Sequence, residues 1–204
     1  VRRIKFDSKV YKFMANQVPE VEYISAQVGK SVTLSYGNQY GSWRLNGVSP
    51  DASKIFNIKM SKGRFINKID IEQRRKIIVI NNDISKVLFP EENPMGKFVI
   101  ADNLTYQIVG VYEDEEGSSN PPAYIPFTTA QTLYSFGYGF HRIDFTVLNL
   151  NTEEKNDLFI KDLRKSISKI QYFEPTDLSA LYVWNTAKDS LQMQGMFYAI
   201  TLVV

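Results

Sequence analysis

Few side chains in this chain of 204 residues could carry out covalent chemistry. The sequence contains no Cys, which excludes disulfides, zinc–thiolate sites and thiol catalysis. Its single His, His141, would have to supply the base of any Ser-His-Asp arrangement. No nucleophile or orienting group accompanies His141 in a recognisable local pattern. We interpret His141 as a structural or surface residue, and we predict no catalytic residue and no enzymatic activity.

Motifs that bind cofactors or metals are also missing from the sequence. There is no G-x-S-x-G elbow, no phosphate-binding loop and no H-E-x-x-H pair. Gly137-Tyr138-Gly139 resembles the start of a dinucleotide-binding motif, but Arg142 stands where the third Gly would be needed. Four consecutive acidic residues, 113–116, lack the alternate spacing of a calcium loop. We predict a solvated loop there, with neither cofactor nor metal.

An aromatic segment supplies the candidate contact residues. Between positions 134 and 140, large rings alternate with Gly and Ser, and such side chains suit protein contact or glycan stacking. The candidate partner-contact residues are Tyr134, Phe136, Tyr138 and Phe140. The alternative is that these rings pack beneath their loop as a satellite of the core.

The composition is that of an ordinary globular protein. Hydrophobic residues make up 44% of the chain and charged residues 23%, and the length allows one domain or two small ones. The formal net charge is only +2, and the basic residues are spread along the chain. We therefore expect no nucleic-acid partner.

The N-terminal part of the sequence predicts one helix and three strands. Asp7 can cap an amphipathic helix that closes at Pro19. Residues 21–28 and 31–36 indicate two strands joined by a tight turn at Gly29-Lys30, and a third strand runs through Trp43 to Val48. Three consecutive strands predict a meander.

Later segments predict a mixture of strands and a long helix. Ile77 to Ile80 are consecutive aliphatic residues, typical of a strand buried on both faces, and a β-hairpin is expected over 97–112. Residues 152–170, capped by Asn151, form the strongest helical pattern. Strands at 143–147 and 179–184 flank this helix and predict a right-handed βαβ unit if they pair in parallel.

A series of weak signatures in the middle of the chain becomes specific when taken in order. The series comprises Gly63-Arg64-Phe65, Asp70, Ile77 to Ile80, Leu88-Phe89-Pro90, Asn93-Pro94-Met95-Gly96-Lys97, Tyr106 to Val111 and Ile125-Pro126-Phe127-Thr128-Thr129. In order and spacing it resembles the extracytoplasmic domain of MacB-like and FtsX-like ABC transporter permeases. The roles of these residues in turns and strands are structural.

The resemblance implies an α+β fold. A porter-like α/β subdomain with βαβ elements would comprise residues 1–48 and 140–190, with a mostly β subdomain inserted at 49–139. Residues 191–204 are expected to form a C-terminal helix that leads into a truncated membrane helix, because Met196 to Val204 are almost wholly apolar. A buried C-terminal helix is the alternative. If the membrane interpretation holds, Val1 and this apolar segment must lie at the same end of the domain.

The resemblance also implies a function without local chemistry. The chain would be the periplasmic domain of a bacterial inner-membrane permease, and it would transmit ATP-driven conformational change during efflux or during lipoprotein or peptide export. The implied partners are a cytoplasmic ABC ATPase, a second permease in a homodimer or heterodimer, a periplasmic adaptor and an outer-membrane channel. The alternatives are a soluble periplasmic binding module, for example for glycans, and a small hydrolase built around His141.

Overall fold

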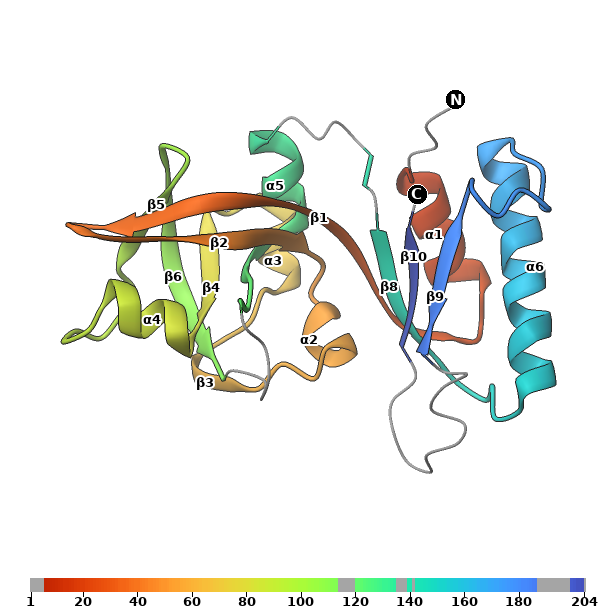
Figure 1. Ribbon diagram of the computed structural model, residues 1–204, viewed down its shortest axis with the longest axis horizontal. Helices are drawn as coiled ribbons and strands as arrows, with labels where there is room; N and C mark the ends of the chain where they lie inside the picture. Colours follow the sequence, from red (N-terminus) through yellow and green to blue (C-terminus); the bar gives the residue numbers. More distant parts are fainter. Residues whose placement is uncertain (1–5, 114–119, 135–138, 141, 187–198, 204) are drawn as a thin grey trace. The chain divides into compact units, whose positions relative to one another are not determined.

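The computed structural model describes residues 6–113, 120–134, 139–140, 142–186 and 199–203 (Figure 1). The chain divides into two compact units, which we call the terminal unit (residues 1–26 and 138–204) and the inserted unit (residues 27–137). The insertion predicted from the sequence began at residue 49. In the structure residues 27–48 group with the inserted unit, because they form a hairpin that pairs with other strands of that unit.

The inserted unit begins with a long hairpin in place of the predicted meander. Strand β1 (Val21–Tyr36) is continuous, and it pairs antiparallel with β2 (Gln39–Val48) around a turn at Gly37. The predicted turn at Gly29-Lys30 is wrong. Gly29 stays in the strand opposite Asn46, where a Cβ atom would lie 2.3 Å from the Asn46 Oδ1 atom. Gly29 therefore makes room for a cross-strand side chain rather than for a turn.

The strands of the inserted unit form a sheet whose order closes on itself. The strands after the hairpin are β3 (Met60–Gly63), β4 (Ile77–Asn81), β5 (Phe98–Ala101), β6 (Leu104–Tyr112) and β7 (Ala123–Pro126). Their order is β2-β7-β4-β6-β5-β1, β1 also pairs with β2, and β3 pairs with β6. Every residue of β4 is buried and β5 pairs antiparallel with β6, which confirms the buried strand and the hairpin predicted from the sequence.

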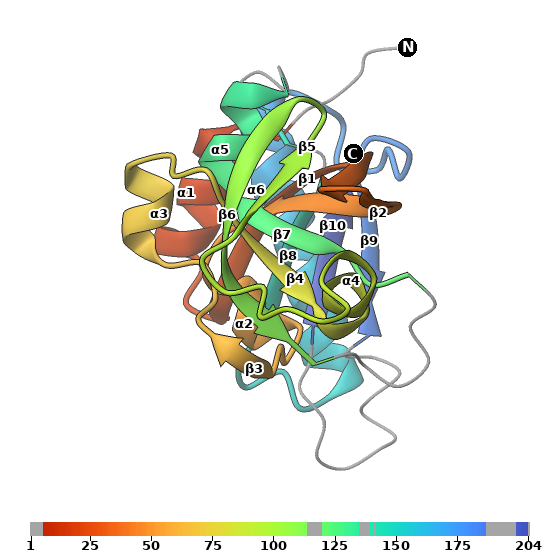
Figure 2. The same ribbon diagram turned by 90° about the vertical axis from the view of Figure 1, so that its left-hand side faces the viewer.

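Short helices flank these strands. They are α2 (Ala52–Ile55), α3 (Lys68–Glu72), α4 (Asn82–Leu88) and α5 (Phe127–Leu133). Figure 2 looks onto this unit and shows α3 and α5 close together, with β4 and β6 between them and α4. The Asn81 side chain caps α4 by accepting from the Ile84 N–H at 2.7 Å.

Over its described residues, the terminal unit comprises a sheet and two helices. Its elements are α1 (Ser8–Gln17), the first part of β1, β8 (Arg142–Val147), α6 (Glu153–Gln171), β9 (Tyr182–Asn185) and β10 (Ala199–Val203). The strand order is β1-β8-β10-β9, and β10 is antiparallel to both of its neighbours. Strands β8 and β9 therefore run in the same direction, but β10 separates them, so the βαβ unit around α6 is a split one.

Side-chain capping and apolar spacing account for where both helices of the terminal unit begin and which face they bury. The Asp7 carboxylate accepts from the backbone N–H groups of Lys9 and Val10, so the predicted cap of α1 is confirmed. Helix α6 is capped by Thr152 rather than by the predicted Asn151. Its buried stripe contains Phe159, Leu163 and Ile167, as the apolar spacing predicted.

The C-terminal segment is a strand over its described residues. The helix predicted for 191–204 is wrong over Ala199–Val203, which form β10; residues 187–198 and 204 lie outside the described residues. Ile200 and Leu202 are fully buried, while Thr201 lies between them on the opposite face of the strand. None of the described helices is long and apolar enough to span a bilayer.

Both ends of the described chain lie at one end of the terminal unit. Phe6 forms a β-bridge with Phe140, and Val203 pairs with Arg142, only two positions further along the chain. Val1 lies outside the described residues, so the placement predicted for it is tested only as far as Phe6.

Candidate functional site

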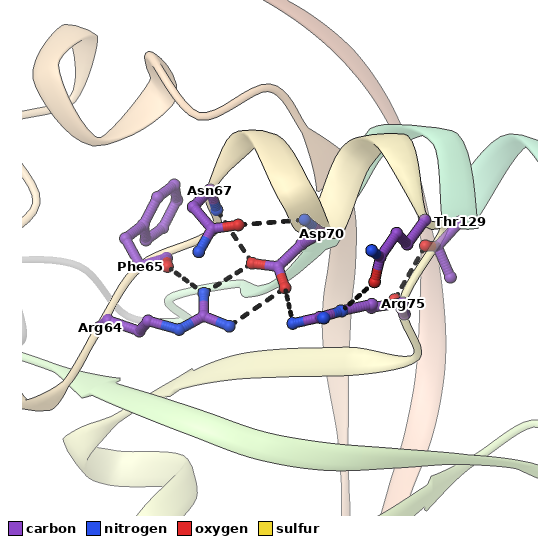
Figure 3. A network of polar contacts seen from close by, with 7 residues as sticks. Arg64, Phe65, Asn67, Asp70, Arg75 and Thr129 are labelled. Carbon is purple, nitrogen blue, oxygen red and sulfur yellow. Dashed lines mark hydrogen bonds and ion pairs between the residues drawn. The ribbon is translucent and has the colours of Figure 1, made fainter.

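Asp70 in α3 is the centre of a polar network in the inserted unit (Figure 3). Its side chain is fully buried and accepts two hydrogen bonds from Arg64. Nη1 donates to Oδ2 at 2.6 Å, and Nη2 donates to Oδ1 at 3.1 Å. Asp70 and Asn67 also form a capping box, in which each side chain accepts from the backbone N–H of the other residue at 3.0 Å. Arg75 adds a second positive charge, with Nη1 3.7 Å from Oδ1.

The surroundings of Asp70 keep its carboxylate ionised. Burial by itself favours the protonated form. The hydrogen bonds from Arg64 and from the Asn67 N–H, together with the charges of Arg64 and Arg75, outweigh burial and hold the pKa of Asp70 below its ordinary value of 3.8. At neutral pH the group only accepts hydrogen bonds and has no proton to donate, so this network is suited to holding structure rather than to acid catalysis.

Helix α5 is hydrogen-bonded to α3 and to the residues that follow it. The Thr128 hydroxyl donates to the Ile71 carbonyl at 2.6 Å, and the Thr129 hydroxyl donates to the Arg75 carbonyl at 2.9 Å. Three signatures that are separate in the sequence, Gly63-Arg64-Phe65, Asp70 and the segment ending at Thr129, therefore meet at one place. The sequence contained each part, but the pairing of Arg64 with Asp70 was not predicted.

Tyr134, the first candidate contact residue, belongs to a second cluster in the inserted unit. It is half-buried, its hydroxyl lies 3.0 Å from the hydroxyl of Tyr106, and the ammonium of Lys30 lies 4.7 Å from the centroid of its ring. Lys30 also forms an ion pair with Asp102. Burial raises the pKa of both tyrosines, so both hydroxyls stay neutral. Much of the Tyr134 side chain is thus engaged within its own unit.

Phe140 packs in the core of the terminal unit. It is 2% exposed, and its ring centroid lies 5.9 Å from that of Phe6 and 6.4 Å from that of Tyr11. The ring is not presented to a partner, so for Phe140 the contact prediction is wrong and the alternative of a satellite core applies. Phe136 and Tyr138, like His141, lie outside the described residues, and their predicted roles are untested.

Asp144 is a second buried carboxylate, and it lies in the terminal unit. It is 1% exposed on β8, the Arg142 Nε atom lies 2.8 and 3.0 Å from its two oxygens, and the Thr201 hydroxyl donates to it at 2.6 Å. Burial raises the pKa of Asp144, although Arg142 and Thr201 act in the opposite direction. The alternation Arg142-x-Asp144 places both side chains on one face of the strand, which is the sequence signal that could have indicated this pair.

The described residues were also compared with the requirements of a metal centre, and a groove lies in the terminal unit. Within them, no group of three or more His, Cys, Asp or Glu side chains is arranged to hold a metal ion. A groove of about 560 Å³ lies in the terminal unit between the end of α1 and α6. Its lining is mixed, with apolar side chains such as Phe13, Pro19 and Leu158 beside charged ones such as Lys155 and Asp162.

Comparison with protein families and curated relatives gives consistent matches. The model of the MacB-like periplasmic core domain matches residues 3–166. A macrolide export ATP-binding/permease protein MacB of Wolinella succinogenes is 34% identical over 118 residues, which cover 55% of this chain and 18% of the relative. A MacB protein of a Shewanella species is 28% identical over 116 residues, again 55% of this chain and 18% of the relative. The match thus spans only about a fifth of the length of these relatives.

Solved structures share the fold. The periplasmic region of MacB from Actinobacillus actinomycetemcomitans superposes with a TM-score of 0.73 at 17% identity, covering 95% of this chain and 86% of that one. The extracellular domain of the ABC-type transporter YknZ from Gram-positive bacteria gives a TM-score of 0.72 at 18% identity, covering 84% and 87%. These likenesses confirm the α+β class with a porter-like α/β subdomain that was predicted from the sequence.

Proposed function

The chain belongs to the family of MacB-like periplasmic core domains, and we propose that it transmits ATP-driven conformational change from the membrane to an exported substrate or an envelope partner. As a member of this family it is the periplasmic domain of an inner-membrane ABC permease. The domain itself would be non-catalytic, because its described buried carboxylates are engaged by neighbouring Arg, Thr or backbone groups.

The arrangement of the chain ends is the observation that carries this proposal. Phe6 lies beside Phe140 and Val203 lies beside Arg142, so membrane segments attached on either side would pull on one end of the terminal unit. Strand β1 then continues without a break from the terminal unit into the inserted unit. A displacement of the terminal unit would reach the inserted unit through this strand.

The inserted unit is suited to transmit such a displacement without absorbing it. The Arg64–Asp70 pair and the two threonine hydroxyls of α5 tie α3, α5 and the end of β3 together. Packed, hydrogen-bonded elements move as bodies rather than deforming continuously. We therefore propose a relay made of stiff parts.

The names of the relatives support export as the process served. Proteins called macrolide export ATP-binding/permease proteins are similar to this chain, and we propose efflux, or lipoprotein or peptide export, as its context. The proposed partners are a cytoplasmic ABC ATPase, a second permease, and a periplasmic adaptor with an outer-membrane channel. A glycan-binding module is the alternative, and it would use the aromatic rings between positions 134 and 140 for stacking. One of these rings, Phe140, is buried and cannot stack on a glycan.

Two experiments on the full-length protein test the proposal. The chain has no Cys, so an exposed Ser42→Cys provides a single label in this domain. Labelling of intact cells by a membrane-impermeant maleimide is expected, and labelling only after lysis would contradict the periplasmic location. Macrolide accumulation is then compared between cells with the intact protein, with residues 6–203 deleted, and with an inactive ATPase. Export that survives the deletion but not loss of the ATPase would refute a relay through this domain.

A further inference from the structure

Strand β9 lies at one end of the sheet of the terminal unit. Among the described residues it pairs only with β10, so its outer side is a sheet edge. Such an edge offers backbone N–H and C=O groups to a second extended chain. Natural proteins often protect an edge with Lys or Pro, and β9 contains neither. Its Tyr, Val and Trp residues favour strand pairing, so this edge is suited to accept one more strand.

Helix α6 lies beside this strand, with a groove of about 480 Å³ between them (Figure 1). The groove is lined by Val183 and Asn185 of β9 and by Asp157, Ile160, Lys161 and Arg164 of α6. Arg164 also donates to the Leu181 carbonyl at 2.8 Å, which holds its guanidinium next to the start of β9. Charged side chains of α6 therefore accompany the open edge.

The charges of α6 differ between its two halves. Residues 153–157 contain three acidic side chains and one Lys, whereas residues 161–169 contain four basic side chains and one Asp. In the groove beside β9 the same order holds, with Asp157 followed by Lys161 and Arg164. The face of α6 that adjoins β9 is thus negative toward its N-terminus and positive toward its C-terminus.

A two-fold axis beside β9 would make this surface complementary to itself. Helix α6 returns the chain from the end of β8 to the start of the parallel strand β9, so α6 and β9 run in opposite directions. The axis that pairs β9 antiparallel with the β9 of a second copy therefore also lays the two α6 helices antiparallel. The negative half of each helix then faces the positive half of the other, with Asp157 opposite Lys161 and Arg164.

The strand and the helix agree on one position for this axis. The groove places residues 183–185 beside residues 157–164, so an axis at Trp184 is level with Ile160, where the charge of the helix changes sign. Val183 and Asn185 face the groove, so Trp184 points to the opposite face of the sheet. Trp184, which is 60% exposed, would pair with the same residue of the second copy, and such aromatic cross-strand pairs are stabilising.

We propose that the edge of β9 and the adjoining face of α6 bind a second copy of this chain about a two-fold axis. A two-fold contact needs a surface that matches itself, and this one does so in strand direction, in charge and in its central residue. A strand of an unrelated protein would satisfy the edge of β9 without matching α6. The inference rests on the proposed function, because a second permease would bring two of these domains together at one membrane.

Disulfide trapping with Trp184→Cys tests the strand contact, in a full-length protein without other Cys. Directly paired residues of an antiparallel ladder have Cα atoms about 4.5–5.5 Å apart, a distance that a disulfide can span. Mild oxidation should therefore link two copies. Tyr40→Cys is the matched control, because Tyr40 is 72% exposed but belongs to the inserted unit, and it should stay unlinked. No link from Trp184→Cys, equal linking in the control, or a link to a different protein would overturn the proposal.

Charge reversal tests the helix contact in the same Trp184→Cys protein. Asp157→Lys and Lys161→Glu, both at exposed positions, should each slow the linking about tenfold, because each change turns two symmetry-related attractions into repulsions. When the two variants are made together with different tags, they should link to each other at the original rate, since opposite charges face each other again. Asp162→Lys, on the side of α6 that faces α1, should have no effect. Mixed pairs that link no faster than either variant alone would overturn the proposal.

The outcomes separate this proposal from the proposed function. Export that needs the domain, in a protein whose Trp184→Cys variant gives no link, would leave the function standing and remove the β9 contact. Linking through Trp184→Cys that obeys the charge exchange, in a protein whose export is unaffected by deleting the domain, would do the reverse.

Discussion

The coupling between Arg64 and Asp70 is open to a direct measurement. Four proteins form a double-mutant cycle: the unchanged chain, Arg64→Ala, Asp70→Ala and the double variant. The cycle isolates the interaction of the two side chains from the other losses that each truncation causes. Those losses are considerable for Asp70→Ala, because Asp70 also bonds the Asn67 N–H and lies near Arg75.

The expected coupling follows from the geometry. Two charge-assisted hydrogen bonds, at 2.6 and 3.1 Å, join the fully buried carboxylate to the guanidinium. A hydrogen bond to a charged group contributes about 1.5–3 kcal/mol. The Arg64 side chain is 41% exposed, so water can replace part of the hydrogen bonding that the guanidinium loses when Asp70 is removed. We therefore expect a coupling of about 2 kcal/mol. Asp70→Ala alone should cost about 3–4 kcal/mol, because it also removes an end of the capping box.

All four proteins also carry Trp184→Phe, so that urea unfolding followed by the emission of Trp43, which lies in β2, reports on the inserted unit. The matched control is a cycle on Lys68 and Glu72, an exposed pair on the same helix with its charged atoms 3.7 Å apart. Its coupling should stay below about 0.5 kcal/mol. An Arg64–Asp70 coupling no larger than that of the control would refute the assignment of α3 to a charge-stabilised network.

The pH dependence of the same cycle has a definite sign. The folded-state pKa of Asp70 is lower than its ordinary value of 3.8, so the stabilisation is complete above that value and is lost as the pH falls through the folded-state pKa. The coupling should therefore be constant from neutral pH down to about 5, and it should shrink only in stronger acid. A coupling that decreases between pH 7 and pH 5 would show that another group carries it.

Two further substitutions probe other features. The Tm of the unchanged chain should fall relative to that of Asp144→Asn as the pH rises from acid to neutral, because burial raises the pKa of Asp144 and disfavours its charged form. A difference in Tm between the two proteins that does not change with pH would contradict this. Gly63→Ala should cost about 3 kcal/mol or more in urea unfolding, since φ is +68° and the new Cβ would lie 2.3 Å from the Val109 carbonyl oxygen. Gly96→Ala, with φ of +78° but open space, should cost only about 1–2 kcal/mol, and equal costs would exclude a steric role for Gly63.

Elements governed by neighbouring residues were predictable. The Asp7 cap, the aliphatic run Ile77 to Ile80 and the 97–112 hairpin each follow from local chemistry, and the structure contains all three. The prediction of a turn at Gly29-Lys30 was wrong because Gly29 is needed in the strand, where it makes room for the Asn46 side chain on the opposite strand. A short apolar run such as 199–203 fits either a helix or a strand, and only its pairing with β8 and β9 decides between them.

The sequence analysis singled out residues of the polar network but did not predict that they meet at one site. Arg64 and Asp70 stood in the recognised signatures, yet their distance depends on how β3 leads into α3. For Phe140, the sequence predicted a contact residue where the structure has a buried one. Its aromatic neighbours in sequence pointed to a surface, whereas its contacts with Phe6 and Tyr11 come from more than a hundred residues away. Burial and pairing at long sequence separation are set by the fold rather than by local pattern.

The position of β10 constrains the order in which the protein can fold. It follows β9 in sequence but lies between β8 and β9 in the sheet, so neither of those strands gains this neighbour until Ala199–Val203 have been synthesised. The inserted unit is a single stretch of chain, 27–137, and can close earlier. On the ribosome the sheet of the terminal unit would thus be the last part to form, with the sides of β8 and β9 open to wrong pairing until then. Newly made chains are most exposed to aggregation during that interval.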